Sequence, residues 1–180
     1  MALLRKELWM RRALQLTITF VLLCTTTQLL ADQSTIVGDV AKKNVVQVAV
    51  GSKDHSTLVT AVKAASLVDS LSNPGPFTVF APTNAAFDKL PKGTVENLLK
   101  PENLAALQDI LEYHVFVGVL RPNMLVDGAD LGEANGDHVK VSVKNGKVFI
   151  NDAAVLASVP AANGIVHVID TVLLPPKKTS

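Results

Sequence analysis

The hydrophobic positions in the first half of the chain follow a helical period. From Ser56, apolar residues recur three and four positions apart as far as residue 68, which predicts a helix capped by Ser56 and bent near Ser66. Shorter helices are predicted in "NAAFDKL" (84–90) and at 94–99, the latter capped by Thr94. A third is predicted in "PENLAALQDILEYH" (101–114), because Pro101 suits a first helical position. The stretch "NVVQVAV" (44–50) fits either a strand or a helix.

The second half of the chain changes to alternation with a period of two. "HVKVSV" (138–143) and "KVFI" (147–150) flank Asn145-Gly146, which predicts a hairpin with positive φ at its turn. "AAVLASV" (153–159) predicts another strand. Asn163-Gly164 precedes "IVHVIDTVLLPP" (165–176), which is apolar on both faces and therefore predicts a central strand. The predicted fold class is α+β in one domain, with helices first and an antiparallel sheet afterwards.

An abrupt corner joins these halves at "TVFAPTNAAF" (78–87). Residues 78–80 are β-branched or aromatic and predict a strand, which is expected to join the sheet. Pro82 removes a backbone donor, and the side-chain oxygens of Thr83 and Asn84 suit the start of a helix. Such corners can carry phosphate loops or nucleophiles, yet this one has no run of glycines, and the chain has no Gly-x-Ser-x-Gly.

The N-terminal segment predicts export. Residues 1–12 are basic, residues 13–30 are uncharged and Ala31 precedes a polar stretch, as in a signal peptide spanning 1–31. An uncleaved membrane anchor and a twin-arginine signal at Arg11-Arg12 are alternatives. Lipid attachment at Cys24 is another, although Leu23 occupies the place where a lipoprotein signal has a small residue. Residues 32–43 are expected to form a loosely held arm, 44–176 the domain and 177–180 a short tail.

Removal of the predicted leader changes the charge and leaves little catalytic chemistry. Residues 1–31 hold four of the 17 basic and one of the 16 acidic residues, so the remainder has 13 and 15 and a formal charge of −2. No basic field is left to attract nucleic acid or anionic lipid. Cys24, the single cysteine, lies in the leader, which excludes a catalytic cysteine and an internal disulfide in the remainder.

The remaining polar residues give no clear metal or catalytic pattern. The four histidines (His55, His114, His138 and His167) lack the spacing of a zinc site. The acidic stretch 126–137 lacks calcium-loop spacing and is expected to be a solvated loop. Aromatic residues make up 4% of the chain, which argues against a stacking platform for bases or sugars. Tyr113 and Arg121 are the candidate contact residues, because interface hot spots favour these types.

Several segments together resemble one known family, the fasciclin domain. "GPFTVFAPTNAAFDKLP" (75–91) resembles its first characteristic segment, and "NGIVHVIDTVLLP" (163–175) resembles its closing one. "LLKPENLAALQDILEYHVFVG" (98–118) is similar to its linking helices and tyrosine-histidine motif, here Tyr113-His114. The resemblance extends over about 44–176.

This resemblance implies a β-sandwich-like wedge fronted by several α-helices. It makes 44–50 helical, makes the corner structural, and makes His114 and His167 buried polar anchors. The residues expected to maintain this fold are Thr78, Phe80, Pro82, Thr83, Asn84, Phe87, Asn163, Gly164, His167 and Asp170.

For function, the resemblance implies a secreted or periplasmic, non-enzymatic module for cell adhesion, extracellular matrix or biofilm contact. Tyr113, His114 and Arg121 are the expected binding residues, with no metal and no cofactor. The protein is expected to be a monomer whose partner is a surface, matrix or host protein or a polysaccharide. Nucleic acid is not an expected partner, and contact with a membrane is expected only through an uncleaved leader. Integrin recognition in animal members also involves an Asp-Ile pair, where this chain has Ser158-Val159. The alternative is an envelope protein that binds a small molecule or lipid in a cleft between helices and sheet.

Overall fold

A computed structural model describes residues 42–176, which belong to one compact unit. The predicted leader, most of the predicted arm and the predicted tail lie outside the described residues. The helices are α2 (Val45–Val50), α3 (Ser56–Ala64), α4 (Val68–Ser72), α5 (Asn84–Asp88), α6 (Thr94–Leu98) and α7 (Leu104–Glu112), with 3₁₀ turns η1 (Lys53–His55), η2 (Pro101–Asn103) and η3 (Pro122–Met124). The strands are β1 (Phe77–Pro82), β2 (Val115–Val117), β3 (Asp130–Gly132), β4 (His138–Lys144), β5 (Lys147–Ile150), β6 (Ala153–Ala161) and β7 (Gly164–Ile169).

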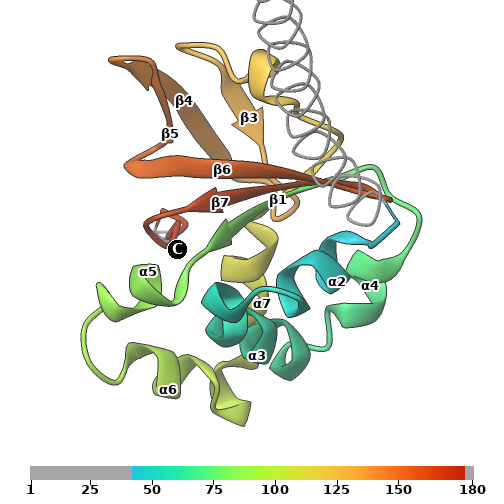
Figure 1. Cartoon of the computed structure of the whole chain (residues 1–180). Coiled ribbons are helices and arrows are strands. Elements are labelled where there is room, and N and C mark those ends of the chain that lie inside the picture. Colours follow the sequence, from blue (N-terminus) through green and yellow to red (C-terminus); the bar gives the residue numbers. More distant parts are fainter. Residues whose placement is uncertain (1–41, 177–180) are drawn as a thin grey trace, which may run out of the picture. The chain divides into compact units, whose positions relative to one another are not determined.

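The strands form a mixed sheet in the order β2-β1-β7-β6-β5-β4-β3. Figure 1 shows β6, β7 and β1 as a middle layer, with β3, β4 and β5 on one side of it and α2 to α7 on the other. The sheet therefore bends back on itself as a wedge, and the helices cover its outer face. This confirms the predicted α+β class with a β-sandwich-like wedge fronted by helices.

Alternation along β1 assigns its side chains to two separate cores. Val79 and Ala81 point to the helical side, where they pack with buried residues of α2, α3 and α7. Phe80, fully buried between them, points into the wedge and packs with apolar residues of β4, β5 and β7. Because successive side chains of a strand face opposite sides, one short strand supports both cores.

The hairpin prediction is confirmed. β4 pairs antiparallel with β5, and both Asn145 (φ 53°) and Gly146 (φ 74°) occupy the left-handed region that a two-residue hairpin turn requires. The stretch 44–50, which fits a strand or a helix by pattern alone, is helical as the family resemblance implies. Asn44 caps it by accepting a hydrogen bond from the Gln47 amide at 2.8 Å.

The sheet differs from the prediction in two respects. β7 is central as expected, but it pairs parallel with β1 and antiparallel with β6, so the sheet is mixed and not purely antiparallel. β7 also ends at Ile169, well before the prolines. Asp170, the next residue, is bonded to Ala154 twice: its N–H donates to the Ala154 carbonyl at 3.2 Å, and its carboxylate accepts from the Ala154 amide at 2.9 Å. Of the apolar residues that follow, Val172 and Leu173 are buried without being part of a strand, and Leu174 is exposed.

Two predicted caps are also wrong. No side-chain hydrogen bond caps α3 from its N-cap residue His55 or α6 from Gly93, and Ser56 and Thr94 are each the first helical residue. The predicted bend near Ser66 is a break: α3 ends at Ala64, and Ser66 adopts φ 57° before α4 begins.

Asn163-Gly164 connects the helical layer to the sheet. The Asn163 amide group donates to the carbonyls of Leu71 (2.9 Å) and Asn73 (2.8 Å), and its oxygen accepts from the Val45 amide at 2.9 Å. A Cβ on Gly164 would lie 1.8 Å from the carbonyl oxygen of Phe77. Gly164 is therefore required by the close approach of β1 and not by a positive φ.

Candidate functional site

Tyr113, a predicted contact residue, lies inside the wedge at the end of α7. Its side chain is 2% exposed, and its hydroxyl donates to the His138 carbonyl at 3.0 Å. The Asn151 amide donates to the same oxygen at 3.1 Å. Burial raises the pKa of this phenol, so it stays protonated and keeps donating. In this conformation Tyr113 connects α7 to β4 and the β5–β6 turn and presents no surface to a partner.

His114, the second predicted contact residue, is 3% exposed and uses both ring nitrogens. Nδ1–H donates to the Ile110 carbonyl at 2.7 Å, and Nε2 accepts from the Leu173 amide at 3.0 Å. Since a carbonyl can only accept and an amide can only donate, this pattern requires the neutral ring. Burial lowers the pKa of His114 to about 4, in agreement with that tautomer.

His167, within β7, is likewise buried and uses both ring nitrogens. Nε2–H donates to the Leu120 carbonyl at 2.7 Å, and Nδ1 accepts from the Ser158 hydroxyl at 2.7 Å. The ring stacks on Phe80 with centroids 5.7 Å apart. Burial lowers the pKa of His167 as well. Ser158 is therefore engaged within the fold.

Arg121, the third predicted contact residue, is the one that is exposed. It lines an open hollow of about 730 Å³ together with Pro76, Asn123, Ser158 and Pro160. Tyr113 and His114 do not line this hollow, so the structure does not bring the three predicted binding residues to one surface. The contact role predicted for them stays a prediction, with Arg121 alone accessible in this conformation.

The residues that the sequence assigns to a structural role make contacts within the fold. Thr78 donates to the Gly118 carbonyl at 2.8 Å and accepts from the Leu120 amide at 2.9 Å. Thr83 is the N-cap of α5 and accepts from the Ala86 amide at 3.3 Å. The remaining members contribute packing or an exposed ion pair: Pro82 is buried, Phe87 packs on the helical core and Asp170 pairs with Lys89 at 3.4 Å.

Asn84 has a role that the sequence did not indicate. Its side-chain oxygen accepts from the Thr57 amide at 3.1 Å and from the Ser56 hydroxyl at 3.3 Å. Its amide group donates to the Lys53 carbonyl at 3.0 Å. Asn84 therefore caps α3 from another element, which explains why Ser56 is not needed as the cap.

The acidic stretch 126–137 is only partly the solvated loop that its composition predicts. It contains β3, and Glu133 is 5% exposed with neither carboxylate oxygen hydrogen-bonded within the described part of the chain. Burial raises the pKa of Glu133 to about 8. The nearby pair His138–Asp130, at 2.9 Å, lies on the surface. Within residues 42–176, no three His, Cys, Asp or Glu side chains come together as a metal site.

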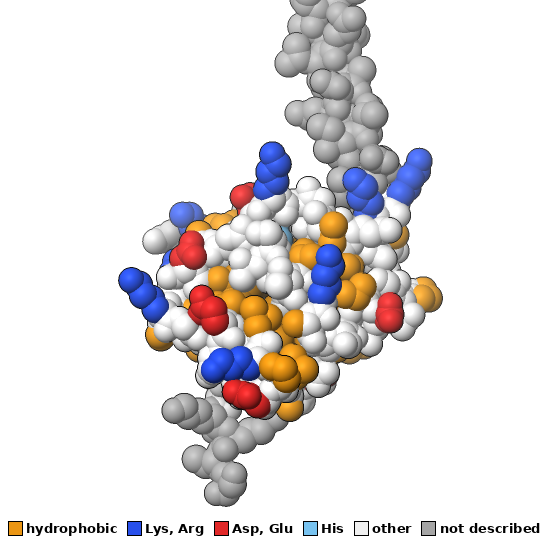
Figure 2. Space-filling view, turned by 90° about the horizontal axis from the view of Figure 1, so that it is seen from below, with side chains coloured by type: hydrophobic (Ala, Val, Ile, Leu, Met, Phe, Trp, Pro, Cys, Tyr) orange, Lys and Arg blue, Asp and Glu red, His pale blue; other side chains and the backbone are white. Residues whose placement is uncertain are grey.

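A cleft on the helical side is the main feature that the residue pattern did not locate. It has a volume of about 110 Å³ and opens between α2, α3, α4 and β1, next to the end of α7. Its lining is apolar apart from Lys63 and the internally bonded His114. Figure 2 shows hydrophobic side chains gathered in patches on the helical face, with basic and acidic side chains between them.

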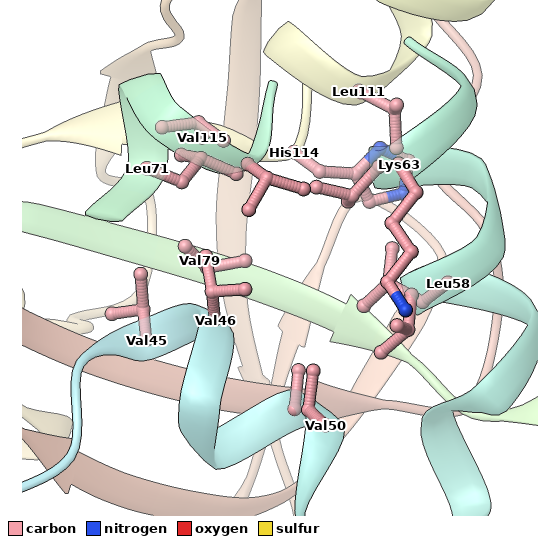
Figure 3. A pocket seen from close by; sticks show the side chains of 14 residues that line it. Val45, Val46, Val50, Leu58, Lys63, Leu71, Val79, Leu111, His114 and Val115 are labelled. Atoms are coloured by element: carbon pink, nitrogen blue, oxygen red, sulfur yellow. The ribbon is translucent and has the colours of Figure 1, made fainter. Parts of the chain in front are cut away.

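The side chains that line this cleft come mostly from short helices. Figure 3 shows valines of α2, Leu58 and Lys63 of α3, and Val79 of β1 around the same space. The sequence feature that could have indicated this cleft is the valine-rich stretch 44–50, because it has more apolar residues than one buried face of a short helix needs. Val50, at its end, is 56% exposed at the cleft.

Comparison with known proteins identifies the family. The model of the Fasciclin domain matches residues 53–175. Protein sll1483 of Synechocystis sp. is 53% identical over 133 residues, which cover 73% of this chain and 73% of that protein. The cell surface glycolipoprotein MPB83 of Mycobacterium bovis is 40% identical over 126 residues, 67% of this chain and 56% of that protein.

A solved structure shares the fold. The domain pair from the insect cell adhesion molecule Fasciclin I matches with a TM-score of 0.66 at 22% identity, over 73% of this chain and 51% of that one. Among residues 42–176, no helix has the length and apolar character needed to cross a bilayer. With the wedge, the covering helices and the family match over 53–175 in agreement, the chain belongs to the Fasciclin domain family.

Proposed function

We propose that the protein is a non-enzymatic interaction module that works outside the cytoplasm in adhesion, matrix or biofilm contacts. The observation that carries this proposal is the Fasciclin match over 53–175, which takes in most of the described residues. One relative is named as a cell surface protein, and the structural neighbour comes from a cell adhesion molecule. The predicted signal peptide at 1–31 supports the same location.

The contact surface in this proposal is the hollow around Arg121. The guanidinium is exposed there beside prolines and amide-bearing side chains, a setting suited to a protein or polysaccharide partner. Tyr113 and His114 do not line this hollow and act within the fold: His114 bonds the end of α7 to Leu173, and Tyr113 bonds α7 to β4 and the β5–β6 turn. Their replacement would alter binding through the fold and not through a lost contact.

The experiment compares attachment of wild-type cells with a deletion strain and adds the purified protein back. Reduced attachment, restored by added protein, is expected. Added Arg121→Ala should restore less than wild type, whereas Lys92→Ala, which changes an exposed cation elsewhere, should restore fully. Equal attachment by both strains on every surface tried would overturn the proposal, and full rescue by Arg121→Ala would remove the hollow from it.

The apolar cleft favours a second candidate function, the binding of a small molecule or lipid. A cleft of about 110 Å³ between the helices and β1 is of the size and character that takes an apolar group of a few carbons. The two functions use different surfaces, because no residue lines both the cleft and the hollow around Arg121.

A further inference from the structure

The apolar cleft on the helical face is lined by one charged residue, Lys63, which is exposed to solvent. Apart from Lys63 and His114, all of its lining side chains are apolar, and no carboxylate lines it. Lys63 lies on α3 and is exposed, and Figure 3 shows its side chain extended alongside the cleft. Resting on the second candidate function, we infer that the cleft binds the aliphatic chain of a monocarboxylate, whose carboxylate pairs with Lys63 at the mouth.

The polarity of the lining determines the orientation of this ligand. A carboxylate cannot be transferred to the floor of the cleft, because both nitrogens of His114 are already engaged with backbone groups and no other donor lines it. The head must therefore stay at the mouth, where Lys63 has no ion pair with another described side chain. An amine head would meet the ammonium of Lys63 and be repelled.

The solvent exposure of Lys63 determines how strongly the cleft should prefer a carboxylate head group. Because Lys63 is exposed to water, its ion pair with the ligand should change Kd only about two- to fivefold. Most of the affinity must come from the chain, with about fourfold per buried methylene. Affinity should therefore depend strongly on chain length and more weakly on the head group.

The volume limits the length of chain that the cleft accepts. A cavity of about 150 Å³ holds a six-carbon ring, so about 110 Å³ holds four to six carbons. Leu58, Leu111 and His114 separate this cleft from a second apolar cavity of about 30 Å³ that Leu98 and Leu107 help to line. Affinity should rise from butyrate to hexanoate and then level off, unless these three side chains move apart.

The test is calorimetric titration of the purified protein with butyrate, hexanoate and octanoate, and with 1-hexanol and hexylammonium at the same chain length. Hexanoate should bind more tightly than butyrate by about tenfold or more, more tightly than hexanol by two- to fivefold, and more tightly than hexylammonium by a larger factor. Lys63→Gln should remove the difference between hexanoate and hexanol. Lys92→Gln, a lysine outside the cleft, should retain it.

A cleft-filling variant locates the site. Ala49→Leu adds a side chain to the α2 part of the lining and should abolish binding. If that variant melts early, methyl NMR shifts of Val46, Leu58 and Val79 in the wild-type protein should still report hexanoate binding. Shifts confined to other methyls would overturn the assignment.

The outcomes separate the inference from the functions on which it rests. Equal binding of hexanoate and hexanol, or an unchanged preference in Lys63→Gln, would overturn the monocarboxylate inference and leave a cleft for apolar molecules. No binding of any six-carbon compound would overturn both the inference and the second candidate function. Binding to anionic phospholipid vesicles without uptake of free hexanoate would also overturn the inference, by assigning the helical face to a membrane. None of these results bears on adhesion.

Discussion

The backbone N–H of Leu173 donates a hydrogen bond to Nε2 of His114 at 3.0 Å, and both residues are buried. The other ring nitrogen of His114 donates to the Ile110 carbonyl at 2.7 Å. One imidazole thus joins the last turn of α7 to the segment that follows the last strand, 59 residues later in the chain. Protonation of this ring would place a second N–H against the N–H of Leu173.

Because these two hydrogen bonds require a neutral His114, we expect the stability of the protein to fall at acidic pH. Burial lowers the pKa of His114 from its ordinary value of 6.5 to about 4 in the folded protein, so the unfolded chain binds more protons between these two values. The stabilisation from His114 is present above pH 6.5 and is lost as the pH falls towards 4, by up to about 1.4 kcal/mol per unit.

The measurement is urea unfolding from pH 7 to pH 5 of the wild type and His114→Gln. Because other buried groups also titrate, the quantity to compare is the difference between the two proteins. The wild type should lose its advantage over His114→Gln as the pH falls. A constant difference across the range would show that His114 is not neutral in the fold. The surface residue His138, replaced by Gln, serves as the control.

Tyr113 predicts a loss of stability that depends on which part of the side chain is removed. Tyr113→Ala removes a buried ring from the wedge core and should cost about 3–5 kcal/mol. Tyr113→Phe keeps the ring and loses the two hydrogen bonds of the hydroxyl, to the His138 carbonyl and from the Asn151 amide group, each of which should cost about 0.5–1.5 kcal/mol. Chemical denaturation of both variants checks this. Equal, small effects would indicate an exposed side chain and return Tyr113 to the contact surface.

The sequence predicts the elements of this fold better than their connections. Alternation at 138–150 and the Asn145-Gly146 turn determine the hairpin locally, so pattern alone is sufficient there. The parallel pairing of β1 with β7 joins residues more than 80 positions apart, and no local pattern carries that information. The same applies to the cap of α3, because the acceptor for the Thr57 amide lies on Asn84.

The candidate site could be predicted only in part, for a related reason. Residue type indicated Tyr113 and Arg121 as contact residues, but burial separates them, since a tyrosine at a helix end can face either water or a core. The apolar cleft arises where short helices meet imperfectly over β1, which is a property of packing and not of any one segment. No pattern in the sequence marks Lys63 as a binding residue, because its role depends on the position of that cleft.

Because Asn84 supplies the cap of α3, we expect unequal losses of stability when Asn84 and its hydrogen-bonded neighbour Ser56 are replaced. Asn84→Ala removes the acceptor for the Thr57 amide and should cost about 1–2 kcal/mol. Ser56→Ala leaves that acceptor in place and should cost a few tenths of a kcal/mol. Thermal melts of Asn84→Ala and Ser56→Ala compare the two losses of stability. If Ser56→Ala proves the more damaging, then Ser56 caps the helix after all.

Glu133 predicts the opposite pH dependence from His114. Its carboxylate is buried without a hydrogen-bond partner among the described residues, and burial raises its pKa from the ordinary value of 4.5 to about 8. The folded protein therefore holds a proton that the unfolded chain releases between these values. The stability that this proton supports is present below pH 4.5 and is lost as the pH rises through 8.

Glu133→Gln removes the ionisable group while keeping its shape, so the variant should be more stable than wild type at pH 8 by about 1–3 kcal/mol. That gain should shrink as the pH falls to 5, where the wild-type carboxyl is protonated. Urea midpoints at pH 5, 6.5 and 8 give the comparison, and Glu96→Gln, at an exposed position, is the matched control. A gain that does not vary with pH would mean that Glu133 is ionised throughout, and that a cation or a rearranged loop accommodates its charge.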